Sequence, residues 1–511
     1  MTNENQETKG PQDQSEAPED QASEPEASPA KGHEDILDDP SRRSFFKRVA
    51  IGGGIALAGG GLTYAGTKAA IHGRSVKDVD KFIKTDETFK PMDQRNVVLT
   101  FAWSKKLNEQ HPERSEQYSK LVKPFHFHET AMHFEHRLPW DNSKPGFTQL
   151  DRALHHAAWY PLDASESHSM AYCQPNTRML RWDQSDVEKE QYQFKSKREA
   201  AWAIKSAARV FGAVRCGITK RDRRWDYDPL YDIENERTLS WERDFPFEPK
   251  TVIVLLTPMD YDNIATAPAW TAEGSVGHGY VLMAQLANQI AKFIRGLGYH
   301  AVGAGNDLGA SVPYGIMAGL GEGGRNQQLL VPGIGPRVRI CKVYTDFEFV
   351  EYDRPHNWGI SKFCLSCGEC AKSCPSGALP MVDSVESGYA FKPTYEHSDQ
   401  PGYTWGNHTG VLKFHSDNKK CYDFWIEGDC ACGNCIASCT YNEPDYWHHW
   451  LSMASTTVAP GFLHTLMSKM HPMFGYGHTG DPAKVKKFWK TGKGMRVNSR
   501  MKNNIGTSGK S

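Results

Sequence analysis

Four closely spaced cysteines constrain this chain more than any other feature. They occur in the run Cys364-Leu-Ser-Cys367-Gly-Glu-Cys370-Ala-Lys-Ser-Cys374-Pro375. This spacing is typical of [4Fe–4S] proteins, in which three cysteines bind one cubane and the fourth, before a proline, binds a neighbouring cluster. Zinc sites typically use paired C-x-x-C units or mixed Cys/His sets, so zinc is the weaker interpretation. The run therefore predicts an electron-transferring protein with two clusters.

A second cysteine set supplies the remaining ligands. Its members are Cys421, Cys430, Cys432, Cys435 and Cys439. By the logic of two-cluster ferredoxins, one cubane is bound by Cys364, Cys367, Cys370 and Cys439. The other is bound by Cys374, Cys432, Cys435 and one more cysteine. That last ligand is either Cys421 or Cys430, and Cys421 is favoured because Cys430 is one residue from Cys432, which strains joint ligation of one cubane.

The N-terminal part of the chain has the pattern of an export signal. Residues 41–47, Ser-Arg-Arg-Ser-Phe-Phe-Lys, form a twin-arginine motif, and a weakly apolar, Gly-rich stretch follows from Val49 to about Ala65. We therefore expect a twin-arginine signal peptide over 41–70, preceded by a disordered n-region over 1–40 that is rich in Glu, Asp and Gln. Export in the folded state suits a protein whose metal centres are assembled before it crosses the membrane.

Charge and hydropathy narrow the class of the mature protein. After about Lys68, no run approaches the roughly 18 apolar residues that a membrane-spanning helix needs, so we expect a soluble or peripheral protein. The chain contains 60 Lys and Arg against 61 Asp and Glu, a formal net charge of -1. Nucleic-acid-binding proteins usually show a strong basic excess, so the charge balance argues against that class.

The middle of the chain predicts a core of mixed helices and strands. Helices are expected over 197–213 and 280–297, and in the second apolar residues recur three or four apart, with Tyr280 at its entrance. Strands are expected over 251–257 and 337–350. Residues from about 79 to 195 show little periodicity, which predicts loops and short elements that cover another part of the protein.

A Gly-rich segment lies over 296–335. Its Gly319-Leu-Gly321-Glu-Gly-Gly324 formally matches the dinucleotide fingerprint G-x-G-x-x-G. The match is weak because that fingerprint requires a strand before it and a helix after it, whereas Pro332 and two glycines interrupt the sequence that follows. We interpret the glycines as allowing the backbone to approach a large flat cofactor or to turn sharply, with a loop that binds nothing as the alternative. These features together suggest an α/β or α+β cofactor-binding core.

The chain resembles the corrinoid- and iron–sulfur-dependent reductive dehalogenases of organohalide respiration. The resemblance covers most of the chain after the leader and rests on the twin-arginine motif, the Gly-rich stretch and the two cysteine sets, with ten residues between Cys421 and Cys432. It implies an α+β fold with a nitroreductase-like corrinoid-binding core and a ferredoxin-like domain. It also implies base-off cobalamin, and no full D-x-H-x-x-G lower-ligand motif is present, since Gly298 stands where Asp would be needed before His300.

The resemblance divides the chain into successive parts. The expected parts after the leader are a covering region over 71–195, the corrinoid-binding core over 196–352, the domain with two [4Fe–4S] clusters over 353–450, and a C-terminal segment over 451–511 that packs on the core.

The family's motifs also point to site residues. The candidate catalytic residues are Tyr280, Arg339 and Asn306, and the candidate cofactor-binding residues are Gly303, Gly305, Gly309, Gly319 and Gly321. Replacing carbon–halogen by carbon–hydrogen needs two electrons and a proton; Co(I) attacks the halogen or donates an electron, and the clusters resupply it. A free tyrosine, with a pKa of about 10, carries a proton at neutral pH. A neighbouring Arg339 would stabilise the tyrosinate, and Asn306 would orient it.

Two other functions share part of this pattern. An exported, non-catalytic electron-transfer subunit would also carry a leader and two clusters, but it would leave the residues before the cysteines without a purpose. An epoxyqueuosine-reductase-like enzyme would use the same cofactors on tRNA, and the leader and the charge balance argue against it. The expected location is the outer face of the cytoplasmic membrane, with peripheral attachment. The expected partners are a halogenated hydrocarbon substrate, a small membrane-anchor protein and a membrane-linked electron donor, with no nucleic acid.

Overall fold

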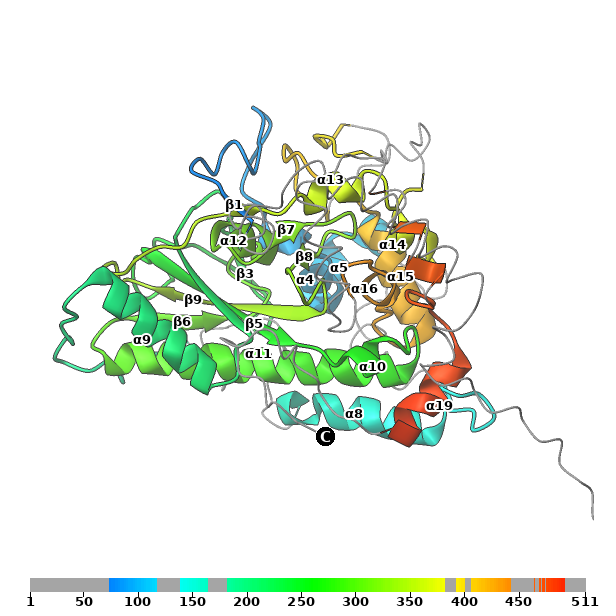
Figure 1. Cartoon of the computed structure of the whole chain (residues 1–511). Coiled ribbons are helices and arrows are strands. Elements are labelled where there is room, and N and C mark those ends of the chain that lie inside the picture. The colour runs from blue at the N-terminus through cyan, green and yellow to red at the C-terminus, as the bar shows by residue number, and fades with distance from the viewer. Residues whose placement is uncertain are drawn as a thin grey trace, which may run out of the picture. The chain divides into compact units, whose positions relative to one another are not determined.

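An antiparallel sheet forms the centre of the fold in the computed structural model (Figure 1). Its four strands, in spatial order, are β2 (Arg215–Lys220), β5 (Thr251–Pro258), β9 (Val338–Thr345) and β6 (Ala301–Ala304). The β5 sequence Thr-Val-Ile-Val-Leu-Leu-Thr-Pro is buried along its whole length. A run without polar alternation is expected for a strand that is covered on both faces.

The structure describes residues 73–116, 138–163, 182–381, 392–399, 406–442, 464, 468–469, 471–473 and 475–491. All of them belong to one compact unit, Tyr64–Ser511. The n-region predicted over 1–40 lies outside the described residues, as does the signal peptide predicted over 41–70. In the described part of the chain, no helix combines the length and the apolar character needed to cross a membrane.

Alternation along β9 sends its charged side chains to opposite faces of the sheet. Lys342 faces α12 (Ser311–Met317), where its Nζ donates to Ser311 Oγ at 2.7 Å. Arg339 is three residues away, an odd number, so its side chain points to the opposite face of the sheet. There it packs against Gly279 of α11 (Trp270–Gly296), where an added Cβ would lie only 2.9 Å from Arg339 Cγ.

The long helix α11 lies between the sheet and α8 (Gln149–Asp163) (Figure 1). Glycines in the first half of α11 make room for its neighbours. A Cβ at Gly274 would lie 2.9 Å from Leu154 Cγ, and one at Gly277 would lie 2.8 Å from the Trp159 ring. The absence of side chains at these glycines therefore lets α8 pack closely on α11 at the height of Tyr280.

Two of the four predicted core elements are confirmed with small shifts at their ends. The helix predicted over 197–213 is α9 (Lys197–Val210), and the strand predicted over 251–257 is β5. The strand predicted over 337–350 is the shorter β9. The helix predicted over 280–297 is α11, which begins at Trp270, so the expectation that Tyr280 lies at a helix entrance is wrong.

The region predicted to be irregular contains one substantial helix. The 15-residue α8 contradicts that prediction over 149–163. The other elements described before α9 are short: β1 (Arg74–Ser75), η1 (Gln94–Asn96), α4 (Val98–Trp103), α5 (Lys105–Gln110) and α6 (Pro112–Glu116). The prediction of short elements therefore describes the beginning of this region and fails at its long helix.

The remaining described elements are short connections around the sheet and the cysteines. Near the sheet they are β3 (Leu230–Asp232), β4 (Arg237–Leu239), α10 (Tyr261–Ile264), β7 (Glu322–Gly323), β8 (Leu329–Leu330) and β10 (His356–Asn357). Around the cysteines and beyond they are α13 (Ile360–Cys364), α14 (Glu369–Lys372), α15 (Asn418–Gly428), α16 (Asn434–Ala437) and α19 (Pro482–Thr491). Most cysteines thus lie on or next to short helices.

The formal dinucleotide fingerprint has the wrong structural surroundings. Helix α12 precedes Gly319, and β7 follows and pairs with β8 as a hairpin. A dinucleotide-binding loop needs the opposite order, with a strand before it and a helix after it. The structure therefore confirms that this match is weak.

Candidate functional site

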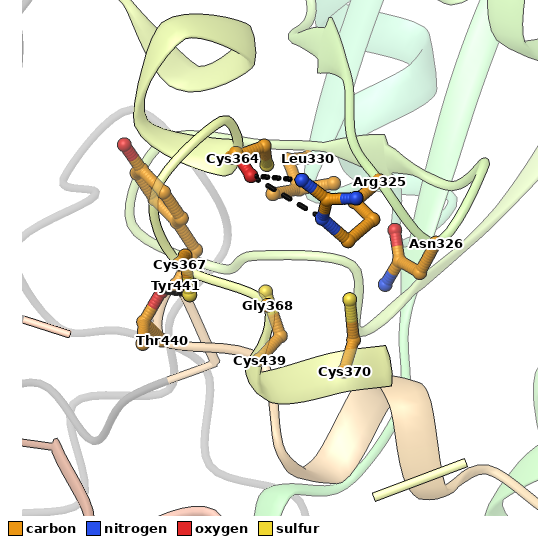
Figure 2. Close-up of a pocket in the computed structure, with 10 residues that line it drawn as sticks. All are labelled: Arg325, Asn326, Leu330, Cys364, Cys367, Gly368, Cys370, Cys439, Thr440 and Tyr441. Carbon is orange, nitrogen blue, oxygen red and sulfur yellow. Dashed lines mark hydrogen bonds between the residues drawn. The ribbon is translucent and has the colours of Figure 1, made fainter. Parts of the chain in front are cut away.

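Four cysteines line one cavity, which Figure 2 shows in close-up. Cys364 ends α13, Cys367 and Cys370 lie on either side of the start of α14, and Cys439 follows α16. The cavity, together with the open solvent at its mouth, contains about 290 Å³ of empty space. Its other lining residues are Arg325, Asn326, Leu330, Gly368, Thr440 and Tyr441. The structure thus brings together the four cysteines that were predicted to share one cubane.

The chemistry of this cavity fits an iron–sulfur cluster. Burial, and next the charge of Cys367, raises the pKa of Cys364 to about 12. Burial also raises the pKa of Cys439 well above its ordinary value. Thiolates in such a place need positive charge among them, which bound iron provides. Among the described residues, no three His, Cys, Asp or Glu side chains converge on one metal ion.

Within the second cysteine set, the surroundings of Cys421 suit a cluster ligand better than those of Cys430 do. After burial, the charges of Cys435, Cys432 and Cys374 are the causes that raise the pKa of Cys421. The thiol of Cys430 donates to the Pro268 carbonyl oxygen at 3.0 Å, and of the described cysteines only the charge of Cys432 acts on it. This geometry favours the same choice that the sequence spacing favoured.

The two cysteine sets are built on a local repeat that the sequence analysis missed. Both Cys367–Cys374 and Cys432–Cys439 have the pattern C-G-x-C-x-x-S-C. In each, the glycine before the short helix has a left-handed backbone, with φ of 77° at Gly368 and 75° at Gly433, a conformation that glycine adopts at little cost. The serines Ser373 and Ser438 meet with their Oγ atoms 2.5 Å apart. The repeats therefore lie side by side, with similar turns.

Tyr280, Asn306 and Arg339 come together from three different elements. Tyr280 lies inside α11 and is 8 % exposed. Asn306 Nδ2 donates to Tyr280 Oη at 3.2 Å, and Arg339 Nη1 donates to the same oxygen at 3.4 Å. The guanidinium carbon of Arg339 is also 4.5 Å from the centroid of the tyrosine ring. The phenol oxygen therefore accepts from two donors, one of them charged.

Buried charged residues hold the loop that carries Asn306. The fully buried Asp307 accepts a hydrogen bond from the Gly305 backbone N–H at 2.8 Å. The Gly305 carbonyl oxygen accepts from Lys342 Nζ at 2.7 Å. Both backbone polar groups of Gly305 are therefore fixed next to Asn306, and this loop is positioned by β9, the strand that also carries Arg339.

Trp159 and Glu273 extend the site and were missed from the sequence. The Trp159 ring stacks on Tyr280, with centroids 5.2 Å apart and planes 27° from parallel. Trp159 Nε1 donates to Glu273 Oε1 at 3.1 Å, and Glu273 Oε2 accepts from the Ala431 N–H at 2.6 Å. Ala431 immediately precedes Cys432. Glu273 thus links the stacking partner of Tyr280 to the second cysteine set. Glu273 lies seven residues before Tyr280, which is two helical turns and therefore the same face of α11. This spacing could have indicated Glu273 only if the helix had been predicted to begin before Tyr280.

Protein packing accounts for most of the candidate cofactor-binding glycines. An added Cβ would crowd Ala287 at Gly303, Tyr344 at Gly309, Arg354 at Gly319 and Leu330 at Gly321. The polar backbone atoms of Gly305 are bonded to Asp307 and Lys342, as described above. These glycines therefore form no open cradle, and a corrinoid contact through them stays a prediction.

Cys435 is electrostatically coupled to Cys370 of the first set and to Arg339. Its charge contributes to the raised pKa of Cys370 in the first set. Burial raises the pKa of Cys435 itself to about 12, and the charge of Arg339 acts in the opposite direction. The Cys435 carbonyl oxygen also accepts from Asn326 Nδ2 at 3.1 Å. Arg339 is therefore electrostatically coupled to the second cysteine set.

Comparison with known proteins places these features in one family. No family model matches the chain. The tetrachloroethene reductive dehalogenase of Desulfitobacterium hafniense strain Y51 is 31% identical over an alignment of 433 residues, and the match covers 70% of this chain and 75% of the relative. The enzyme of the same name from Dehalobacter restrictus gives the same identity and coverage. The tetrachloroethene reductive dehalogenase of Sulfurospirillum multivorans is 30% identical over 54% of this chain and 56% of its own length.

Solved structures show the same fold. The catabolic reductive dehalogenase NpRdhA matches 82% of this chain with a TM-score of 0.57 and 19% sequence identity. Its complex with 3-bromo-4-hydroxybenzoic acid matches 80% of the chain with a TM-score of 0.56. The matched part is about half of the solved chain, 50% and 49% respectively. With mixed helices and strands, the two cysteine sets and relatives of this identity, the chain belongs to the reductive dehalogenases.

Proposed function

We propose that this reductive dehalogenase replaces a carbon–halogen bond of a halogenated hydrocarbon by a carbon–hydrogen bond. The overall change consumes two electrons and one proton and releases halide. The convergence of Asn306 and Arg339 on the hydroxyl of Tyr280 carries the proposal, since it offers a proton donor in a chain that also contains two cysteine sets. Anaerobic respiration, with the organohalide as terminal electron acceptor, is the proposed context.

Tyr280 is the proposed proton donor. Its hydroxyl donates the proton to carbon, and the tyrosinate left behind accepts hydrogen bonds from Asn306 Nδ2 and Arg339 Nη1. Arg339 stabilises the negative charge, and Asn306 orients the oxygen. General acid catalysis of this kind contributes about 10²–10⁴-fold to a rate. The stacked Trp159 restricts the ring, so the hydroxyl keeps one direction.

Two [4Fe–4S] clusters and a base-off corrinoid are the proposed cofactors. The proposed ligands are Cys364, Cys367, Cys370 and Cys439 for one cluster, and Cys374, Cys421, Cys432 and Cys435 for the other. When bound, the corrinoid supplies reduced cobalt for cleavage of the carbon–halogen bond, and the clusters supply its electrons. Family membership supports the corrinoid, and a solved structure with this fold is described as acting in B12-dependent dehalogenation.

The proposed architecture follows from the same observations. A nitroreductase-like core over 196–352 would contain the sheet, α11 and the tyrosine site. A ferredoxin-like domain over 353–450 would contain both cysteine sets, and the paired C-G-x-C-x-x-S-C repeats support it. The covering region over 71–195 would contribute Trp159, and the segment over 451–511 would pack on the core.

The substrate, location and partners are proposed from the relatives and the leader. Chlorinated ethenes are the first substrate class to test, because the relatives at about 30% identity are named for tetrachloroethene. A brominated phenol is the second, because NpRdhA was solved with one. The twin-arginine motif supports export to the outer face of the cytoplasmic membrane. There, a small membrane-anchor protein and a membrane-linked electron donor would be partners.

Metal content tests the proposal before any substrate is chosen. Protein reconstituted without oxygen, with iron, sulfide and cobalamin supplied, should contain about eight irons and one cobalt per chain. Reduced protein should then release halide from tetrachloroethene or from the brominated phenol. Iron without cobalt would contradict the proposal and favour a non-catalytic electron-transfer subunit.

Two cysteine variants form a matched pair for the same measurement. C421S should lose the irons of one cluster, because Cys421 is the proposed fourth ligand of the second set. C430S should keep about eight irons, because that thiol is directed to the Pro268 carbonyl oxygen. The reverse result would exchange their roles and leave the rest of the ligand assignment intact.

A further inference from the structure

Arg325 is an unusual lining residue for a cavity of four cysteines. It lies between β7 and β8 and is 2 % exposed. Its Nε and Nη2 donate to the Cys364 carbonyl oxygen at 3.2 and 2.6 Å, as the dashed lines in Figure 2 show. The guanidinium carbon also lies 4.6 Å from the centroid of the Phe414 ring. The side chain is therefore held in one orientation from two sides.

The guanidinium is electrostatically coupled to the first cysteine set. The charges of Cys370, Cys364 and Cys367 all act on Arg325. Glu322 supplies nearby charge of the opposite sign: it is 2 % exposed, and its charge contributes to the raised pKa of Cys364. Its carboxylate accepts hydrogen bonds from the backbone N–H groups of Trp358, Ile360 and Ser361. Lys372 and Glu369 form an ion pair beside the same set, but the Lys372 side chain is 54% exposed.

We propose that Arg325 sets the reduction potential of the cluster bound by Cys364, Cys367, Cys370 and Cys439, by placing a fixed positive charge beside it. This inference rests on the proposed function, which assigns a cluster to that cavity. Reduction adds a negative charge to the cluster, and a positive charge in a buried, poorly screened position stabilises the reduced form. Arginine suits the role because it stays protonated when buried and its planar group can donate twice to one oxygen.

The test compares reduction potentials among charge variants of the reconstituted protein. R325Q removes the buried charge and should make reduction of the first cluster at least about tenfold less favourable, which is about 59 mV for one electron. R325K keeps a charge and should stay much closer to the unmodified protein. K372Q removes an equal charge from an exposed position and should change the potential little, because solvent screens it. Potentiometric titrations monitored by electron paramagnetic resonance report both clusters, and the second should not move.

Each outcome separates this inference from the proposed function. Unmodified protein without iron in this cavity would overturn the proposed function. A full complement of iron in R325Q with an unchanged potential would overturn only the role of Arg325. Equal shifts in R325Q and R325K would also overturn it, because lost hydrogen bonds rather than charge would then be the cause. If R325Q does not retain its cluster, E322Q decides: removal of that negative charge should shift the potential in the positive direction, and no shift contradicts the electrostatic argument.

Discussion

The hydroxyl of Tyr280 is surrounded by groups from three other parts of the chain. Asn306 and Arg339 donate to its oxygen, and Trp159 covers its ring. A tyrosine kept only for packing would need neither a guanidinium nor an amide at its oxygen. The position of the partly buried Arg339 side chain is reasonable if negative charge develops next to it during turnover.

Removal of the Tyr280 hydroxyl should therefore affect turnover and little else. In Y280F, halide release should fall by about 10²–10⁴-fold, because the proton donor is lost while the ring still stacks on Trp159. Iron and cobalt contents should match those of the unmodified protein. Y352F is the control: its hydroxyl meets Thr251 at the other end of β5, at 3.0 Å, and its loss should leave turnover within a few-fold. Full activity in Y280F would exclude the tyrosine as proton donor.

The buried carboxylate of Glu273 has a structural task that can be tested separately. It accepts from Trp159 Nε1 and from the Ala431 N–H. In E273A both donors lose this acceptor in a buried place, so the free energy of unfolding should fall by about 2–4 kcal/mol. W159F removes one of these hydrogen bonds together with its donor, so no buried donor is left without a partner. The loss of that bond should therefore lower the free energy of unfolding by less, about 1 kcal/mol. Anaerobic urea denaturation measures both, and equal stability of E273A and the unmodified protein would contradict this account.

At the scale of elements, the sequence predicts helices and strands where apolar periodicity is strong and fails where packing requires small residues. The buried run of β5 and the apolar pattern of α9 and the second half of α11 are visible in the chain. The first half of α11 contains Gly274, Gly277 and Gly279, which lower helix propensity. Those glycines are required by Leu154, Trp159 and Arg339, which come from distant parts of the chain. Only the tertiary structure reveals that reason.

The same limit explains which part of the site was predicted. The ligands of the first cluster were named from spacing, and Tyr280, Asn306 and Arg339 were named from the family's motifs. The structure brings each of these two groups together. Trp159 was missed because α8 contains two histidines and Pro161, which obscure its helical pattern. Glu273 was missed because the first half of α11 was not predicted. Arg325 carries no local signal, since its meaning depends on a cavity formed by cysteines at least 39 positions away.

The contact between the N-terminal segment and the segment that precedes α15 should depend on pH. His408 Nε2 donates to the Lys90 carbonyl oxygen at 2.7 Å, and its ring stacks on Phe89. Burial is the main cause that lowers the pKa of His408 to about 4. The unfolded chain, with an ordinary histidine pKa near 6.5, therefore binds more protons between about pH 6.5 and 4. This contribution to stability is complete above about pH 6.5 and decreases as the pH falls through that window.

H408Q is the variant that isolates this effect. Its melting temperature should depend less on pH between about 6.5 and 4 than that of the unmodified protein, because the titrating group is gone. Carboxylates that are shared by both proteins cancel in the comparison. Parallel pH profiles would show that His408 does not contribute to the acid sensitivity.

At the scale of the whole molecule, the cysteine-rich part and the sheet are held together by buried polar contacts. Arg337, next to the start of β9, donates to Asn442 Oδ1 at 2.9 Å. Asp429 Oδ2 accepts from Arg152 Nη2 of α8 at 2.7 Å, with both side chains buried. The Ala431 N–H donates a hydrogen bond to Glu273, and the Cys435 carbonyl oxygen accepts one from Asn326. Stabilisation of the cysteine-rich part should therefore also stabilise β9, α8 and α11, which carry the tyrosine site.

Removal of iron should then destabilise the sheet as well as the cysteine loops. Clusters bind only the folded thiol arrangement, so their binding free energy adds to folding. Anaerobic iron chelation should lower the melting temperature by roughly 5–10 °C. Hydrogen exchange should become faster in β9 and α11 in addition to the cysteine-rich residues. If faster exchange stopped at the residues between Cys364 and Cys439, the contacts at Arg337, Asp429 and Glu273 would not transmit order. The tyrosine site would then be stable without its metal centres.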